Sequence, residues 1–374
     1  MSFAIRAAGV LLCASASRAL AQFDTTAWRF AGDSARVETF AGRPALMLRD
    51  ALAYMPATRF RVGTIEFDLN VSNAAGFVGV QFRMQGAEDY EDFYFRPMNS
   101  GAPDATQYQP VFHGNTGWQI YVGPRYTAPI ELHHDRWMHV KLVVDDDHAA
   151  VFVDSDTIAQ YIPRLLGPTG TGIVAIYARF TAARFANVRV DTTRVAIPRR
   201  SVPESEAPAG VVPHWRVSPV VSEKLVAGKT ALTPSDTRAI RWTDLAATER
   251  GIVNLGVAGT RSMDTNTVLA SVVIRADAQR RLPFRLGFSD RARVYLNGRL
   301  VFVGDDSYRS RDPRFLGTVG LYDTLILPLD KGTNTLVVAV SEESGGWAVI
   351  GAFDPTPGVT LVPAATVRAI GSRR

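Results

Sequence analysis

Hydrophobic and polar residues alternate along most of this chain, and the alternation predicts strands. Clear runs lie at residues 64–70, 77–83, 92–96, 118–122, 138–144, 150–153 and 173–177. Between residues 23 and 190 no run keeps the 3.6-residue period of a helix. A second series follows at residues 268–274, 283–288, 292–303, 324–329 and 335–340. The pattern therefore predicts an all-β protein.

Turn-forming residues separate these runs. Asp145–Asp147 predicts a turn between two strands, because Asp tolerates turn geometry. Asn297-Gly298 predicts a two-residue type I′ hairpin, since both residues accept positive φ. Between residues 192 and 213 a proline recurs every five residues, which blocks regular pairing and stiffens the chain. We therefore expect a linker there, between a domain at residues 22–191 and another at 214–364.

The first 21 residues predict a secretory signal peptide. They contain Arg6, a short apolar run from Ala7 to Ala14, and Ala19-Leu20-Ala21 as a small-x-small cleavage site. The apolar run is shorter than the ~20 residues that span a bilayer. We expect an exported protein, periplasmic or extracellular, without membrane insertion. Residues 365–374 are expected to form a frayed tail.

Composition narrows the chemistry. The chain has 374 residues, of which 47% are hydrophobic and 21% charged, which excludes a disordered chain. Its one cysteine, Cys13, lies in the predicted leader, so the mature chain has no disulfide, thiolate nucleophile or thiolate-bound metal. The formal charge of +5 falls to +3 without Arg6 and Arg18. Because positive and negative charges nearly balance and the protein is expected to be exported, we do not expect a nucleic-acid partner.

One polar sheet face is the main candidate site. If Val78, Val80 and Phe82 face the core, the residues between them face outward, and the same holds around Phe93 and Phe95. The outward residues are Gln81, Arg83, Asp92, Tyr94 and Arg96. Carboxylate, amide and guanidinium groups bond sugar hydroxyls in pairs, and a ring stacks on the apolar sugar face. The alternative is an ordinary solvated face of an antiparallel sheet.

The segment from Pro97 to His113 is expected to be a long loop at the edge of that face. It is rich in turn residues and carries Asn99, Asp104, Gln107 and Tyr108. Long loops on a rigid sheet often carry function, although this one could equally be structural.

Other candidate sites are weaker. His133, His134, Asp135 and His139 could suggest a metal cluster, but adjacent histidines on a strand point to opposite faces, so no metal site is predicted. No nucleophile elbow, phosphate loop or dinucleotide fingerprint occurs. The loop at residues 304–317 could hold a polyol or a cation, or its opposite charges could pair with one another. Trp347 is expected to fill the core.

Several segments resemble known families. The first domain resembles a concanavalin A-like lectin/glucanase domain of the laminin-G or 3-keto-disaccharide-hydrolase-like kind, through residues 91–97 (EDFYFRP), 103–108 (PDATQY), 118–121 (WQIY), 137–144 (WMHVKLVV) and 185–190 (FANVRV). The second is similar to galactose-binding-like β-sandwiches found beside secreted glycosidases, through residues 289–302 (SDRARVYLNGRLVF) and 327–340 (LPLDKGTNTLVVAV).

The first resemblance implies a lectin, a hydrolase or an adhesion module. Laminarinase-type glucanases use Glu-x-Asp-x-x-Glu. Here Glu66 and Asp68 share a strand face, but Val71 stands where the third carboxylate would be. The resemblance therefore does not supply a retaining carboxylate pair at this strand.

The combined prediction is an all-β fold of two antiparallel β-sandwich (jelly-roll) domains joined by a Pro-rich linker. We expect a non-catalytic protein that binds an oligo- or polysaccharide on the polar face of the first domain, without metal or cofactor. The expected ligand-binding residues are Gln81, Arg83, Asp92, Tyr94, Arg96, Asn99, Asp104, Gln107 and Tyr108. One alternative is a glycoside hydrolase or lyase that uses Glu66, Asp68, Glu91 or Asp92. A further alternative is a protein-interaction or adhesion module.

Overall fold

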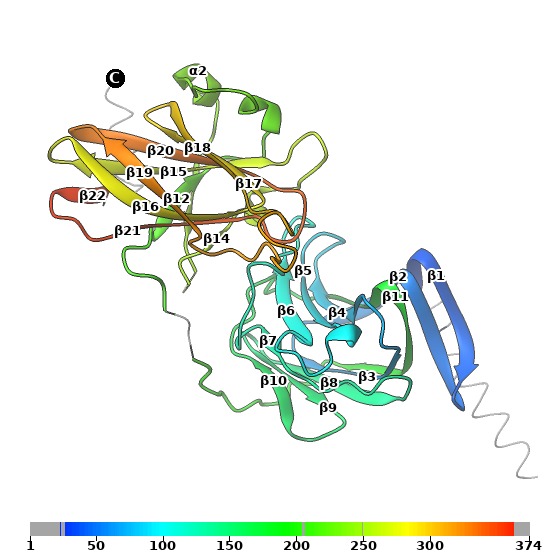
Figure 1. The fold of residues 1–374 in the computed structure, drawn as a ribbon. Helices are drawn as coiled ribbons and strands as arrows, with labels where there is room; N and C mark the ends of the chain where they lie inside the picture. The colour runs from blue at the N-terminus through cyan, green and yellow to red at the C-terminus, as the bar shows by residue number, and fades with distance from the viewer. Residues whose placement is uncertain (1–22, 24–26, 204–205, 249, 363–374) are drawn as a thin grey trace, which may run out of the picture. The chain divides into compact units, whose positions relative to one another are not determined.

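A computed structural model describes residues 23, 27–203, 206–248 and 250–362 of the chain. The predicted signal peptide and C-terminal tail lie outside the described residues. The chain divides into two compact units: residues 1–111 with 121–203, and residues 112–120 with 204–374. Strands in each unit pair in an antiparallel manner, which confirms the predicted all-β class (Figure 1).

One sheet of eleven strands makes up the first unit. Its strands are β1 (Arg29–Phe40), β2 (Arg43–Phe60), β3 (Gly63–Val71), β4 (Phe77–Met84), β5 (Tyr90–Phe95), β6 (Thr106–Val111), β7 (Thr127–Ala128), β8 (Met138–Val144), β9 (Ala149–Val153), β10 (Ile158–Ile162) and β11 (Gly172–Asp191). The main path runs β10-β9-β8-β3-β11-β4-β5-β6-β7, and the β1–β2 hairpin adds to β11. A short 3-10 helix, η2 (Pro97–Asn99), follows β5.

The long strand β11 lets this sheet fold into two layers. Its first half pairs with β4 and its second half pairs with β3. Figure 1 shows β3, β8, β9 and β10 on one side of the unit and β4, β5 and β6 on the other. Aromatic side chains pack between the strands, such as Phe67 against Phe185 with ring centroids 5.5 Å apart. Each such buried side chain stabilises the fold by about 1.5–3 kcal/mol.

Two facing sheets make up the second unit. The larger contains β12 (His214–Val217), β13 (Thr243–Ala246), β15 (Thr267–Ala276), β17 (Arg291–Leu296), β18 (Arg299–Asp305), β20 (Gly332–Ser341) and β22 (Val359–Val362); the smaller contains β14 (Val253–Asn254), β16 (Arg280–Ser289), β19 (Asp323–Leu329) and β21 (Ala348–Phe353). Short helical turns η3 (Glu223–Leu225), α2 (Pro234–Thr237) and η4 (Leu255–Ala258) lie in the connections. Both sheets contribute to one core that includes Trp215, Phe284 and Trp347.

Two local predictions have clear outcomes. Asn297 and Gly298 have φ of 50° and 81° and join β17 to β18, so the predicted hairpin is confirmed. Residues 118–122, predicted as a strand, form turns instead, and residues 112–120 group with the second unit. Alternation was a poor guide there because Gln119 and Ile120 are both buried despite their opposite polarity.

The first part of the proline-rich segment packs against the first unit. Ile197 is buried in a cluster with Val143, Ala150 and Tyr161 on the outside of β8, β9 and β10. The Nε2 atom of His148 lies 3.2 Å from the carbonyl oxygen of Ile197. Residues before Pro203 are therefore held by side-chain contacts rather than free of the sheet.

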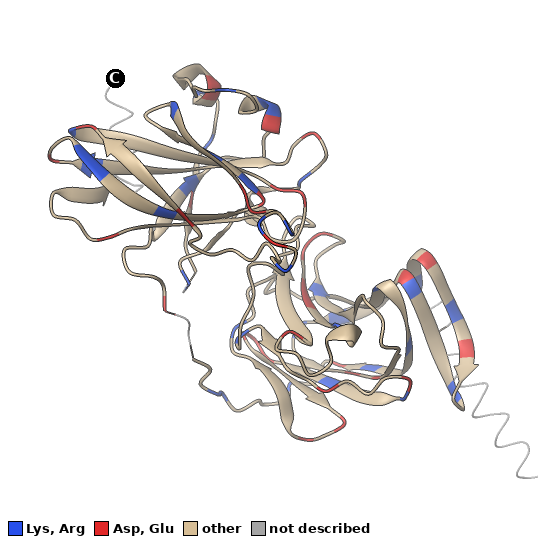
Figure 2. Ribbon diagram, viewed as in Figure 1, with Lys and Arg blue, Asp and Glu red and all other residues tan. Residues whose placement is uncertain are grey.

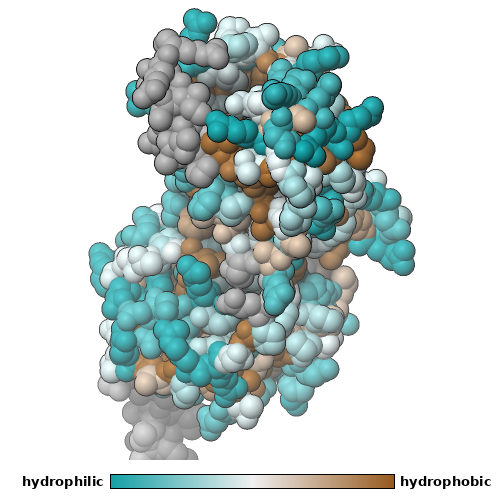
Figure 3. Space-filling model, turned by 90° about the vertical axis from the view of Figure 1, so that its left-hand side faces the viewer, coloured by the Kyte–Doolittle hydropathy of each residue, from teal (hydrophilic) through white to brown (hydrophobic). Residues whose placement is uncertain are grey.

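Charges of both signs are scattered along each unit, and the face seen in Figure 3 is mostly hydrophilic with hydrophobic residues in small patches (Figures 2 and 3). Within the described part of the chain, no helix has the length and apolar character needed to cross a membrane.

Candidate functional site

The centre of the predicted polar face consists of side chains that bond to one another. Gln81, Asp92 and Gln109 lie side by side on β4, β5 and β6. The two carboxylate oxygens of Asp92 accept hydrogen bonds from Gln109 Nε2 and from Tyr177 OH, each at 3.0 Å. Burial raises the pKa of Asp92 to about 6, although both bonds act in the opposite direction. This centre is a buried hydrogen-bond network.

Arg83 does not share that face, contrary to the prediction from alternation. The β4–β11 register shifts beside it, and its φ is +52°. Its buried guanidinium donates to the carbonyl oxygens of Arg61, Asp145 and Asp146. A bulge reverses the direction of the side chains that follow it, so a strict two-residue period fails here.

Tyr108 also differs from its expected role as a loop residue. Residues 106–111 form β6, so the second half of the predicted loop is a strand, and Tyr108 points away from the face that carries Gln107. The Tyr108 hydroxyl donates to Glu91 Oε2 at 2.7 Å and accepts from the backbone N–H of Leu166. Burial raises the pKa of Glu91 to about 7. Tyr108 and Glu91 therefore belong to the interior.

Tyr94, Arg96 and Gln107 come together where β5 ends and β6 begins. The Tyr94 hydroxyl donates to Gln107 Oε1 at 2.7 Å, and burial raises the pKa of Tyr94. Arg96 Nη2 donates to the same Gln107 oxygen and to the Tyr94 hydroxyl. The Arg96 guanidinium carbon lies 5.1 Å from the centroid of the Tyr94 ring. These contacts hold the Arg96 side chain at the strand end.

Asn99 and Asp104 extend this group into the turn between β5 and β6. Arg96 Nη1 donates to the Asp104 carbonyl at 2.8 Å and lies 3.7 Å from the Asp104 carboxylate. Asn99 Nδ2 lies 3.2 Å from both carboxylate oxygens of Asp104. The Asp104 side chain is 38% exposed. Of the nine predicted residues, the structure gathers Tyr94, Arg96, Asn99, Asp104 and Gln107 at this strand end.

Two aromatic residues that the sequence analysis did not select complete this cluster. Phe77 lies with its ring centroid 5.4 Å from that of Tyr94 and 6.1 Å from that of Phe180. Phe180 is 77% exposed and has φ of +59°, in the register shift of β11 between Ala178 and Ala182. A bulky residue is rarely held in this conformation. We call Phe77, Tyr94, Arg96, Asn99, Asp104, Gln107 and Phe180 the strand-end cluster.

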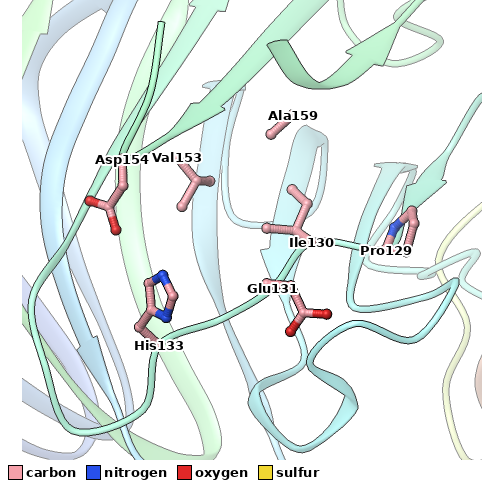
Figure 4. A pocket seen from close by; sticks show the side chains of 7 residues that line it. All are labelled: Pro129, Ile130, Glu131, His133, Val153, Asp154 and Ala159. Carbon is pink, nitrogen blue, oxygen red and sulfur yellow. The ribbon is translucent and has the colours of Figure 1, made fainter. Parts of the chain in front are cut away.

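Beside the turn lies a pocket of about 320 Å³ (Figure 4). Pro129, Ile130, Glu131 and His133, which follow β7, line one part of it, and Val153, Asp154 and Ala159 from the β9–β10 side line the rest. Glu131, His133 and Asp154 are exposed. The backbone N–H of His139 donates to Asp154 Oδ1 at 2.7 Å, which fixes that carboxylate.

The histidines considered as metal ligands are dispersed. His133 lines the pocket, His134 Nε2 lies 2.9 Å from the Pro97 carbonyl oxygen, and His139 Nδ1 lies 3.0 Å from Asp68 Oδ1. Asp68 also accepts from Arg43 and Asn187. Of the carboxylates considered for hydrolysis, Glu91 and Asp92 occupy opposite faces of β5. Glu66 and Asp68 share a face of β3, where Asp68 already has Arg43, His139 and Asn187 as partners.

The candidates in the second unit have structural partners. In the loop at residues 304–317, Arg311 bonds to Asp306 and Asp323, so its opposite charges pair. Trp347 is buried in the core and its Nε1 donates to the Val340 carbonyl at 3.0 Å.

Comparison with known proteins found no matching family model and no matching curated protein. Among solved structures, the chain is similar to the carbohydrate binding module CBM66 from Bacillus subtilis, with 12% identity, a TM-score of 0.33, and 43% of this chain and 93% of that chain covered. It is similar to the galectin LEC-6 from Caenorhabditis elegans, with 10% identity, a TM-score of 0.26 and coverage of 44% and 99%. A glycosyl hydrolase family 16 protein from Mycobacterium smegmatis is similar at 14% identity, a TM-score of 0.29 and coverage of 44% and 91%.

Proposed function

We propose that this protein is an exported carbohydrate-binding protein, without catalysis, and that the strand-end cluster of its first unit binds the glycan. The observation that carries the proposal is Phe180, a large aromatic side chain that is 77% exposed and held at φ +59° by a bulge. Strained residues of this kind concentrate at ligand sites, and bulges redirect side chains next to them.

The rings offer a surface for the apolar face of a sugar. Phe180 and Phe77 contact edge to face at 6.1 Å, with ring planes 70° apart. The exposed Phe180 ring would be covered by a stacked pyranose or furanose, which removes apolar area from water. Met98, on the turn that also carries Asn99, is 61% exposed and would offer further apolar surface.

Polar groups beside the rings would fix the orientation of the sugar. A carboxylate has about four lone-pair positions, and Asp104 uses part of this capacity for Asn99. Its exposed oxygens can accept from sugar hydroxyls. Arg96 holds Asp104 through the backbone carbonyl and is itself held by Gln107 and Tyr94. The polar groups are thus fixed before a ligand arrives, which reduces the ordering cost of binding.

Hydrolysis is not proposed, because Glu91 and Asp92 lie on opposite faces of β5. Asp68, which shares a face of β3 with Glu66, already has three bonding partners. Glycosidases need two carboxyl groups about 5–10 Å apart on either side of the scissile bond. Glu91 contacts Tyr108 in the interior, whereas Asp92 contacts Gln109 and Tyr177 on the other face.

The test is binding of the mature chain to insoluble and soluble arabinan, xylan, cellulose and galactan, followed by titration calorimetry with the retained polysaccharide. We expect Phe180→Ala to weaken binding at least tenfold, with Phe30→Ala, an exposed aromatic change on β1, as the matched control.

If no polysaccharide is retained, or if Phe180→Ala binds as the unchanged protein does, the proposal is wrong. Release of reducing sugar at high protein concentration would support the hydrolase alternative instead. Capture of a protein in place of any glycan would support the adhesion alternative.

A further inference from the structure

We propose that the pocket lined by Glu131, His133 and Asp154 is a second subsite for the same glycan, and that it selects neutral, hydroxyl-rich sugar units. This inference rests on the proposed function of the strand-end cluster. It adds that the protein binds chains that extend from Phe180 across the β5–β6 turn into the pocket.

The turn between β5 and β6 connects the strand-end cluster with the pocket. Asn99 bonds to Asp104 in the strand-end cluster. Two residues later, the Gly101 N–H donates to the carbonyl oxygen of Ile130, a pocket residue, at 3.0 Å. The Cα atoms of Asn99 and Gly101 are at most about 7 Å apart. From Phe180 on β11 to the residues that follow β7, a ligand would pass the ends of β4, β5 and β6, with neighbouring strands about 4.8 Å apart, so a chain of several sugar units is needed to reach both surfaces.

A second set of contacts fixes Glu131 against this turn. Ser100 Oγ lies 3.4 Å from Glu131 Oε2 and accepts from the backbone N–H of Leu132 at 2.7 Å. A Cβ atom at Gly101 would lie 2.5 Å from Glu131 Oε1, so the glycine allows this close approach. Glu131 thus contacts the β5–β6 turn and also lines the pocket.

Strand register places both surfaces at one end of the first unit. Val78, next to Phe77, pairs with Phe95, next to Arg96. Thr106, the first residue of β6, pairs with Ala128 at the end of β7, directly before the pocket residues. Thr106 Oγ1 also donates to Gln160 Oε1 on β10 at 2.6 Å, beside Ala159. The strand-end cluster and the pocket therefore share this end.

The chemistry of the pocket favours a neutral sugar. Its polar side chains are two carboxylates and one imidazole, and no Lys or Arg lines it among the described residues. Carboxylates accept hydrogen bonds from hydroxyl groups but repel uronate or sulfate groups. Ile130, Val153 and Ala159 supply the apolar contact that a sugar face needs. The volume of about 320 Å³ lies at the lower end of the range of small-molecule sites.

The experiment is titration calorimetry of the full mature chain with arabino-, xylo-, cello- and galacto-oligosaccharide ladders of one to six residues. We expect affinity for the bound series to rise about tenfold or more once the chain fills both subsites, because the second contact becomes intramolecular. Glu131→Gln and Asp154→Asn should remove this rise and leave the affinity for the shortest bound sugar unchanged. Asp156→Asn, an exposed carboxylate change in the same β9–β10 turn that does not line the pocket, is the matched control.

The outcomes separate the two proposals. If Phe180→Ala weakens all lengths but the pocket variants leave the length dependence intact, the second subsite is wrong and the proposed function stands. If no oligosaccharide binds, the proposed function fails. A uronate-containing ladder that binds more tightly than the neutral ones would overturn the assignment to neutral sugars.

Discussion

The centre and the end of the β4–β5–β6 face carry similar side chains, yet these differ in what they contact. At the centre, both oxygens of Asp92 are bonded by Gln109 and Tyr177 within the same sheet. At the end, Asp104 is bonded by Asn99 and remains 38% exposed. The Phe180 ring, which is linked to Asp104 through Phe77 and Arg96, faces solvent. The presence of polar side chains on a sheet face is therefore not enough to identify a binding site.

Position on the strand explains the difference. In the middle of a sheet every side chain has neighbours on both sides, so carboxylates, amides and hydroxyls pair with one another. Where strands end, the turn supplies side chains on one side only, and backbone bulges can present a ring outward. The predictions below test whether the centre is structural and the end is functional.

The largest expected effect is on stability, from Asp92→Ala. This change removes the acceptor shared by Gln109 and Tyr177, and the loss of each buried hydrogen bond costs about 1–3 kcal/mol. We expect the free energy of unfolding to fall by roughly 2–4 kcal/mol in urea denaturation. Glycan affinity of the folded fraction should stay the same. A matching loss of affinity would mean that the centre belongs to the site.

The pH dependence of stability should also report on the centre. The pKa of Asp92 is raised from 3.8 to about 6, so between these values the folded state keeps a proton that the unfolded state has lost. Stability must then fall as pH rises through this window, by up to about 3 kcal/mol, and Asp92→Asn should remove this part of the profile. The difference between unfolding free energies at pH 4 and pH 7 checks it, with Asp104→Asn as the control carboxylate. Identical profiles for Asp92→Asn and the unchanged protein would contradict the assignment.

Phe180→Gly should change stability and binding in opposite directions. Glycine accepts φ of +59° without the steric cost that a side chain incurs, so we expect stability to rise by roughly 0.5–1 kcal/mol. Loss of the ring should weaken glycan binding at least tenfold, about 1.4 kcal/mol. Thermal denaturation and calorimetry on one preparation measure both. A fall in stability would show that the Phe180 ring contributes to packing of the fold.

Asp104→Asn should have the smallest effect. The amide keeps one acceptor but introduces donors that oppose Asn99, so we expect about a threefold loss of glycan affinity, roughly 0.7 kcal/mol. Stability should change by less than about 1 kcal/mol because the side chain is partly exposed. A loss larger than that of Phe180→Gly would make the carboxylate, rather than the ring, the main determinant.

Alternation in the sequence predicts much of the fold and part of the cluster. It places Tyr94 and Arg96 on one face, and turn composition selects Asn99 and Asp104. It does not predict Arg83 or Phe180, because both lie at bulges whose position depends on how β11 pairs with its neighbours. The β1–β2 hairpin is also missed, since its exposed first strand lacks clear alternation and its turn uses Ala41 at φ +46°.

The position of residues 112–120 limits how the gene for this protein can be divided between its two units. These residues stand between β6 and β7 in the sequence, yet they belong to the second unit. There Asn115 Nδ2 donates to the carbonyls of Gly256 and Gly259 at 3.1 and 3.0 Å, and Gln119 Nε2 donates to that of Leu316 at 2.8 Å. A gene fragment encoding only residues 204–374 would lack all three bonds. The second unit is therefore not encoded by one continuous stretch of the gene. Recombination at the proline-rich segment would separate residues 204–374 from residues 112–120, which belong to the same unit.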